Sequence, residues 1–105
     1  MQLIYQNKSI KIKECISFFD RFLGFMGKTN INSGLLFNNC SSIHTFFMKE
    51  TIDVIMLNKE NKILYYYPKL KKNKVILPKK NVSKTIELPT HYFNFKINDQ
   101  ITIID

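Results

Sequence analysis

The chain has 105 residues, of which 45% are hydrophobic and 23% charged, and its formal net charge is +8. This size and composition predict one packed domain over residues 1–105 and exclude a disordered chain. No apolar run approaches the roughly 20 residues that a membrane-spanning helix needs. Residues 1–8 also lack the apolar core of a signal peptide. We therefore expect a basic cytoplasmic protein without membrane contact, in which Cys15 and Cys40 are reduced.

Two short strands are predicted at the N-terminus, Gln2–Tyr5 and Ser9–Lys13, on either side of a polar turn. In the second of them Ile10 and Ile12 alternate with lysines, which is the pattern of a strand with one buried face. The pattern predicts a β-hairpin.

A helix is predicted next, over Phe18–Met26. Ser17 is a suitable N-cap, and Gly27 follows the last helical position. Phe18, Phe22 and Phe25 fall at i, i+4 and i+7, so they would form one apolar face.

The rest of the chain consists of short apolar segments, which are predicted strands, separated by polar turns. Residues 58–62 are expected to be the turn of a meander, and residues 89–95 either a turn or a short second helix. The apolar segments are Gly34–Phe37, Ile43–Met48, Ile52–Leu57, Ile63–Tyr67, Val75–Leu77, Thr85–Leu88 and Ile101–Ile104. Together they predict a mainly β (β-rich α+β) domain, either an antiparallel sandwich or a partly closed barrel.

Four of these pieces, in this order, resemble the domain of unknown function 192 family of bacterial and archaeal proteins. The pieces are Arg21–Met26, Gly34–Phe37, Ile43–Met48 with Ile52-Asp53 soon after it, and Ile86–Pro89. With Asn98-Asp99 before the last strand, the resemblance covers roughly residues 18–104. It implies a compact, mostly antiparallel β domain of jelly-roll-like type with a helix near the N-terminus. It implies no activity.

Asp53 and His44 are the candidate functional side chains, because each interrupts an apolar segment. A buried carboxylate must be paired or must open onto a cleft, and a histidine can carry protons near neutral pH. The structural alternatives are that Asp53 accepts hydrogen bonds from the backbone or from Arg21, and that His44 is satisfied by a neighbour at the edge of the core. The functional interpretation is a ligand-binding cleft near Arg21, His44, Met48 and Asp53.

The relation between His44 and Asp53 depends on the connection at residues 49–51. If Ile43–Met48 and Ile52–Leu57 form a hairpin with an even loop, His44 and Asp53 share one face of the sheet. An odd loop puts them on opposite faces, which excludes a common role.

No metal or cofactor is predicted. Cys40, His44 and Met48 share a face of a regular strand, but residues four apart on a strand are about 13 Å apart and cannot bind one ion together. The sequence also contains no zinc-ligand spacing, nucleophile elbow or phosphate loop.

A lysine-rich segment is the main candidate for a binding surface. Lys69, Lys71, Lys72, Lys74, Lys79, Lys80 and Lys84 follow three consecutive tyrosines, Tyr65–Tyr67. Lysines beside aromatic rings can hold single-stranded nucleic acid or another polyanion. The alternative is a solvated loop that protects a strand edge, and a single arginine in the chain argues against base-specific recognition.

These observations favour a small binding or accessory module whose partner is a small molecule or a protein. An enzyme that uses His44 and Asp53 as an acid–base pair ranks second. Nucleic-acid binding by the lysines ranks last, and the oligomeric state stays open.

Overall fold

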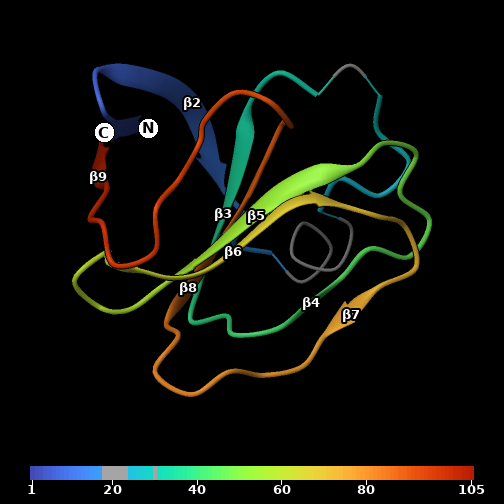
Figure 1. Cartoon of the computed structure of the whole chain (residues 1–105). Coiled ribbons are helices and arrows are strands. Elements are labelled where there is room, and N and C mark those ends of the chain that lie inside the picture. Colours follow the sequence, from blue (N-terminus) through green and yellow to red (C-terminus); the bar gives the residue numbers. More distant parts are fainter. Residues whose placement is uncertain (18–23, 30) are drawn as a thin grey trace.

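The computed structural model describes residues 1–17, 24–29 and 31–105, and these residues contain nine strands and no helix (Figure 1). The strands are β1 (Gln2–Tyr5), β2 (Lys8–Glu14), β3 (Gly34–Asn38), β4 (Ile43–His44), β5 (Ile52–Leu57), β6 (Ile63–Leu70), β7 (Val75–Ile76), β8 (Lys84–Leu88) and β9 (Thr102–Ile104). The mainly β fold predicted from the sequence is confirmed.

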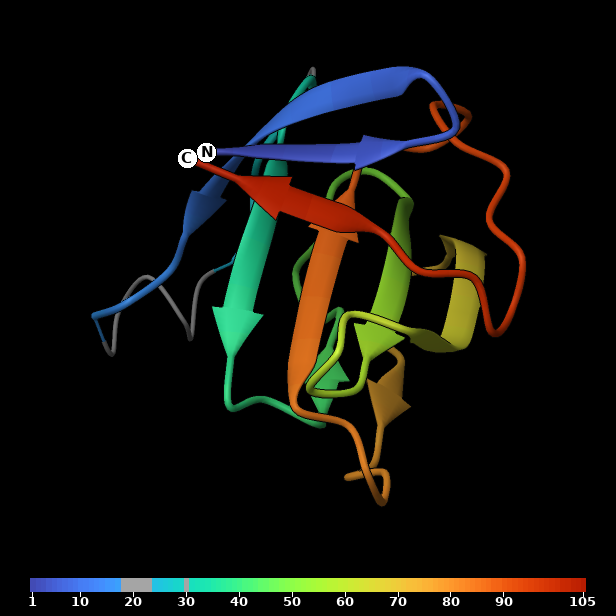
Figure 2. The ribbon, with the colours of Figure 1, turned by 90° about the vertical axis from the view of Figure 1, so that its left-hand side faces the viewer.

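Seven strands form one curled sheet in the order β6-β5-β8-β3-β2-β1-β9 (Figure 2). Neighbouring strands are antiparallel, except that β2 and β3 are parallel. The two ends of the sheet approach each other, because Lys62 and Gln100 form an isolated bridge and the Ile63 N–H donates to the Asp99 carbonyl at 2.8 Å. The sheet is therefore a half-barrel. This agrees with the partly closed barrel, one of the two architectures predicted from the sequence.

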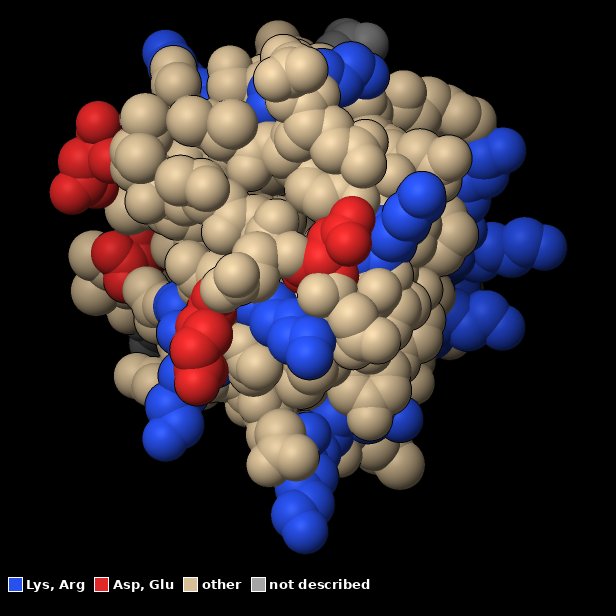
Figure 3. Space-filling view, turned by 60° about the vertical axis from the view of Figure 1, so that its left-hand side comes forward, with Lys and Arg blue, Asp and Glu red and all other residues tan. Residues whose placement is uncertain are grey.

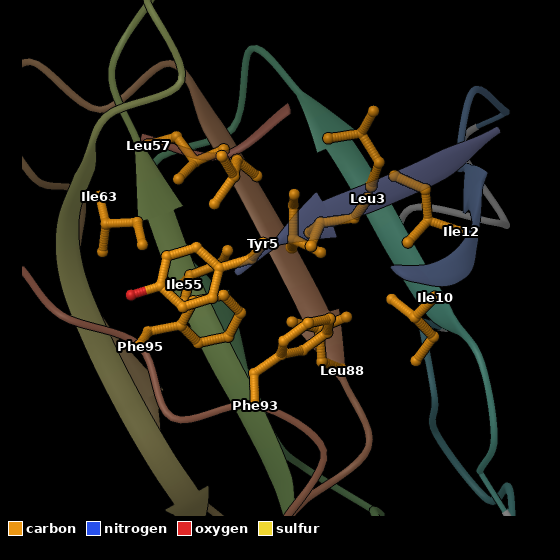
Figure 4. Packing of buried hydrophobic residues seen from close by; sticks show 13 residues of the cluster. Leu3, Tyr5, Ile10, Ile12, Ile55, Leu57, Ile63, Leu88, Phe93 and Phe95 are labelled. Carbon is orange, nitrogen blue, oxygen red and sulfur yellow. The ribbon is translucent and has the colours of Figure 1, made fainter. Parts of the chain in front are cut away.

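The main core fills the concave side of the half-barrel (Figure 4). Alternate residues of the strands supply it, including Ile55, Leu57, Ile86 and Leu88. The C-terminal segment adds rings that contact Tyr5, whose ring centroid lies 6.2 Å from that of Phe93 and 4.9 Å from that of Phe95. The Tyr5 hydroxyl donates to Asp99 Oδ2 at 2.7 Å, so this buried polar group is satisfied.

A smaller core lies on the opposite side of the sheet. Its buried members are Phe25, Met48, Ile52 and Val54. A two-stranded ribbon of β4 and β7 contributes to this layer, since Ile43 packs against the cluster.

The predicted strand Ile43–Met48 is too long, because only Ile43–His44 is extended. A turn follows, in which Phe47 has a left-handed φ of 62°. β4 pairs with β7 and not with β5, so the hairpin proposed between residues 43–48 and 52–57 is wrong. The prediction was wrong because Phe46 and Phe47 are hydrophobic and were expected to be buried in a strand, whereas both are exposed in the structure.

The predicted helix Phe18–Met26 falls mainly on residues 18–23, which lie outside the described residues. The last residues of the predicted helix form a turn together with Gly27. In this turn Gly24 and Gly27 have positive φ angles of 49° and 72°. Residues 89–95 form a turn and not a short helix, with His91 at a φ of 65°.

Candidate functional site

Asp53 lies near the start of β5, with its side chain on the same face of the sheet as Ile55 and Leu57. Only 2% of its surface is exposed. On one side Asp53 pairs with Leu88 of β8. The carboxylate thus sits at one end of the main core.

A β-bulge on β6 explains how Asp53 is accommodated. Ile52 pairs with Leu70 and Val54 with Tyr67, so Asp53 alone opposes two residues, Pro68 and Lys69. Proline has no N–H, and Lys69 has a left-handed φ of 50°. The Lys69 N–H donates instead to Asp53 Oδ1 at 2.8 Å. The side chain therefore satisfies a backbone group that the bulge removes from the strand pairing.

Asp53 also lines a surface hollow of about 350 Å³. The hollow is formed where β2 begins, where β6 bulges and where the chain leaves β8. Its lining residues are Lys8, Asp53, Tyr66, Pro68, Lys69, His91, Tyr92, Phe93 and Asn94. One carboxylate and three basic side chains thus share a volume suited to a small ligand.

Lys8 joins the aromatic side of the hollow to β2. Its Nζ lies 5.1 Å from the centroid of the Tyr92 ring and 5.8 Å from that of Phe93, and it donates to the Tyr92 carbonyl. The Tyr92 hydroxyl in turn donates to the Ser9 carbonyl at 2.7 Å. These contacts hold residues 91–94 over the start of β2, although the two segments are far apart in sequence.

Burial raises the pKa of Asp53 above its usual value, because desolvation disfavours the charged carboxylate. The Lys69 N–H and the charges of His91 and Lys69 oppose this shift only in part. Burial also raises the pKa of Tyr66, and the nearby Asp53 charge adds to that effect. The carboxylate therefore accepts a proton more readily than an exposed aspartate does.

The other residues of the predicted cleft do not line this hollow. His44 lies on β4, and its ring stacks on that of Phe46 at a centroid distance of 5.1 Å. Met48 is buried in the smaller core. Arg21 falls outside the described residues. The histidine beside Asp53 is His91, which the sequence did not reveal because only the pairing of β8 with β5 brings it there.

The described residues include no group of three or more His, Cys, Asp or Glu side chains placed to hold a metal ion. Cys40 donates its thiol hydrogen to the Ser42 carbonyl at 3.1 Å.

The lysine-rich segment spans the end of β6, all of β7 and the loop that leads to β8. Tyr65 and Tyr67 stack at 6.4 Å, and Lys79 Nζ lies 5.6 Å from the centroid of the Tyr65 ring. Lys84 donates to Asn61 Oδ1 at 2.6 Å. On the face shown in Figure 3, basic side chains project around the rim and acidic groups lie between some of them.

A second buried carboxylate, which the sequence analysis missed, is Glu87 of β8. It pairs with Leu35 and Val54 on the side of the sheet opposite Asp53 and is only 5% exposed. Its Oε1 has no hydrogen-bond partner among the described residues, and a Cβ added at Gly24 would lie 3.0 Å from it. Burial raises the pKa of Glu87 to about 7, although a hydrogen bond from the Phe25 backbone opposes the shift.

Two substitutions at Asp53 should separate its charge from its acceptor role. Asp53→Asn should change the free energy of unfolding by less than about 1 kcal/mol, because an amide oxygen can still accept the Lys69 N–H. Asp53→Ala should cost about 1–3 kcal/mol, since that N–H loses its acceptor. Urea unfolding of both variants measures the difference. A loss of about 3 kcal/mol in Asp53→Asn would instead mean that the fold needs the ionised carboxylate.

Comparisons with known proteins place the chain in a family without giving an activity. It is 33% identical over 100 residues to a UPF0127 protein of Thermococcus sibiricus, covering 87% of this chain and 64% of that protein. It is 35% identical over 85 residues to a UPF0127 protein of Thermococcus kodakarensis, covering 75% of this chain and 54% of that protein. The chain therefore spans between about half and two thirds of these relatives.

Two solved structures share the fold. One is a protein of unknown function from Novosphingobium aromaticivorans, with a TM-score of 0.77 at 8% identity over 97% of this chain and 82% of that one. The other, from Sinorhizobium meliloti, is named as a candidate transcription regulator and has a TM-score of 0.76 at 12% identity over 96% of this chain and 89% of that one. At these identities the likeness concerns the fold alone.

The family model described as "Uncharacterized ACR, COG1430" (DUF192) matches residues 2–103. That match spans nearly the whole chain and agrees with the resemblance seen in the sequence. The chain belongs to the DUF192 family.

Proposed function

We propose that this domain is a small-ligand binding module whose site is the hollow over Asp53. The observation that carries the proposal is the buried Asp53 carboxylate at a hollow that three basic side chains also line. Binding sites are commonly concave, with aromatic walls and a few polar groups that fix the ligand's orientation. Tyr66, Tyr92 and Phe93 supply such walls.

The charges of the site favour a ligand with two different ends. Asp53 can accept a hydrogen bond from an ammonium or hydroxyl group. Lys8, Lys69 and His91 favour a carboxylate or another small anion. An amino acid or a similar zwitterion carries both groups within a few bonds, so this is the ligand class that the hollow fits best.

The second hypothesis, an enzyme that uses His44 and Asp53 as an acid–base pair, is no longer supported. The two residues belong to different sheets. The cytoplasmic location expected from the sequence remains part of the proposal.

The binding test uses glycine as the probe, with ethylamine and acetate as its two separate halves. Glycine should perturb the amide NMR signals of residues around the hollow at lower concentration than either half does. Asp53→Asn should weaken glycine and ethylamine binding about tenfold, because a charge-assisted hydrogen bond is lost. Lys8→Gln should weaken glycine and acetate binding instead.

Glu60→Gln is the matched control, because Glu60 is an exposed carboxylate in the turn between β5 and β6. It should leave all three affinities unchanged. The proposal would be contradicted if no probe moved these signals, or if glycine and ethylamine moved them equally in Asp53→Asn and the wild type.

A further inference from the structure

Four large hydrophobic side chains are exposed on and beside the β4–β7 ribbon. Phe46 is 41% exposed, Phe47 76%, Val75 53% and Leu77 68%. We call these four residues the apolar tip. Contiguous exposed apolar residues on a small protein commonly mark a contact with a partner or a membrane.

Strand pairing brings the members of the apolar tip together. His44 pairs with Val75, and both point away from the core, whereas the Ile43–Ile76 pair on the other face packs inward. Leu77 follows directly after β7 and is also exposed. Phe46 joins that face through the stacking of its ring on His44. Figure 1 shows β4 and β7 side by side, away from the strands of the half-barrel.

Thr45 attaches a turn of lysines to this ribbon. Its side chain is 1% exposed, donates to the Lys71 carbonyl at 2.6 Å and accepts from the Lys74 N–H at 2.8 Å. Its backbone N–H donates to the Lys74 carbonyl at 2.8 Å, and its carbonyl accepts from Asn73 at 3.0 Å. The 71–74 turn is therefore held next to Phe46, and its three lysines are all exposed.

The chain on the β7 side of the apolar tip carries charge of one sign. Residues 61–86 contain eight lysines and no aspartate or glutamate. The ribbon and its flanking loops thus combine exposed apolar groups with a continuous basic segment.

We propose that the apolar tip docks on the surface of an anionic phospholipid bilayer. The four apolar side chains would enter the interface between headgroups and acyl chains, while the lysines of the 71–74 turn would contact anionic headgroups. Such peripheral docking needs no spanning segment, and no helix among the described residues is long and apolar enough to cross a membrane. The proposal thus replaces the expectation of no membrane contact, which considered only a spanning segment or a signal peptide.

The backbone at Phe47 supports a role for its exposure. A phenylalanine with a φ of 62° is conformationally unfavourable, and Phe47 gains little from burial in return. The Gly27 N–H donates to the Phe47 carbonyl at 3.0 Å, which helps to hold this conformation. The turn therefore presents an aromatic ring outward at a cost to the fold.

The composition of the apolar tip favours a bilayer over nucleic acid. Val75 and Leu77 have no ring to stack on bases, and half of the tip is therefore unsuited to single-stranded nucleic acid. Aliphatic and aromatic groups together suit the interface of a bilayer. Lysine is a flexible point charge that suits headgroups without a fixed geometry.

Vesicle co-sedimentation of the whole chain tests the proposal. The protein should sediment with vesicles of equal parts phosphatidylcholine and phosphatidylglycerol but not with phosphatidylcholine alone. Phe47→Asp should reduce the bound fraction about tenfold, because a ring leaves the interface and a negative charge enters. Leu77→Asp is a second variant that should act in the same direction. Both positions are exposed, so both variants should keep the wild-type circular dichroism spectrum and should lose no thermal stability.

Matched controls separate the apolar tip from general stickiness and charge. Ile97→Asp changes an apolar residue that is 49% exposed near the opposite end of β6, and it should bind like the wild type. Lys71→Gln with Lys74→Gln should weaken binding more than Lys11→Gln with Lys96→Gln, which removes the same charge elsewhere.

Three results would overturn docking at this surface. The first is that neither kind of vesicle binds the protein. The second is that the control variants lose as much binding as the tip variants. The third is that the lysine variants weaken binding to polyuridylate and to vesicles equally while Phe47→Asp and Leu77→Asp change neither, which would identify a polyanion surface instead.

Discussion

Glu87→Gln is expected to stabilise the protein by about 2 kcal/mol above pH 7. The folded protein raises the pKa of Glu87 from 4.5 to about 7 because the carboxylate is buried. A shift of this size corresponds to a cost of about 3 kcal/mol for keeping the ionised group folded. The amide removes that cost, but its buried NH₂ group has no acceptor and destabilises the fold by about 1 kcal/mol.

The raised pKa of Glu87 also determines how the free energy of unfolding changes with pH. A carboxyl group whose pKa is higher in the folded state binds more protons there than in the unfolded state, so stability falls as pH rises. The loss should begin near pH 4.5 and end near pH 7. Glu87→Gln should therefore be about 1 kcal/mol less stable than the wild type below pH 4.5, where only the cost of the buried amide remains, and about 2 kcal/mol more stable above pH 7.

Urea unfolding at several pH values measures the difference between Glu87→Gln and the wild type. Glu60→Gln serves as the control, since Glu60 is exposed and its difference should not vary with pH in this way. A Glu87→Gln difference that is constant with pH would show that Glu87 is not the titrating group.

Leu88→Ala is expected to lower the free energy of unfolding by about 2–5 kcal/mol. Leu88 is fully buried in the main core at the end of β8, where it pairs with Asp53. The loss combines the buried area of the side chain with the cavity left behind.

Leu77→Ala is the matched substitution, because Leu77 is 68% exposed. It should change the free energy of unfolding by less than about 0.5 kcal/mol. Thermal or urea unfolding compares the two variants directly. If Leu77→Ala is as destabilising as Leu88→Ala, the ribbon has a packing role and the apolar tip is less available for docking.

Local sequence patterns predicted many of the strands well. The alternation of Ile10 and Ile12 with lysines marks β2, and the apolar segment Ile52–Leu57 coincides with β5. The turn after β5 was also predicted, and there Asn58 Oδ1 accepts from the N–H groups of Glu60 and Lys62, both at 3.0 Å. These features depend on residues within a few positions of one another, so a single sequence is enough to reveal them.

The candidate site was only partly predictable. Asp53 was recognisable because a carboxylate inside an apolar strand needs a partner or a cleft. Glu87 gave a weaker signal, since Ile86-Glu87-Leu88 also fits an alternating strand with an exposed glutamate. Only the layer that contains Phe25 on the second face of the sheet makes Glu87 a buried group.

By itself, the sequence determined the family, the mainly β class and most strand positions, and it singled out Asp53 as a candidate functional residue. Only the tertiary structure decided that β4 leaves the main sheet for β7, that His91 and Lys8 line the same hollow as Asp53, and that Phe46 and Leu77 are both exposed. The physical reason is that strand partners are chosen by long-range packing and bulges. The Asp53 side chain and the Pro68-Lys69 bulge are 15 or more positions apart in the chain, yet they form one hydrogen-bonded unit.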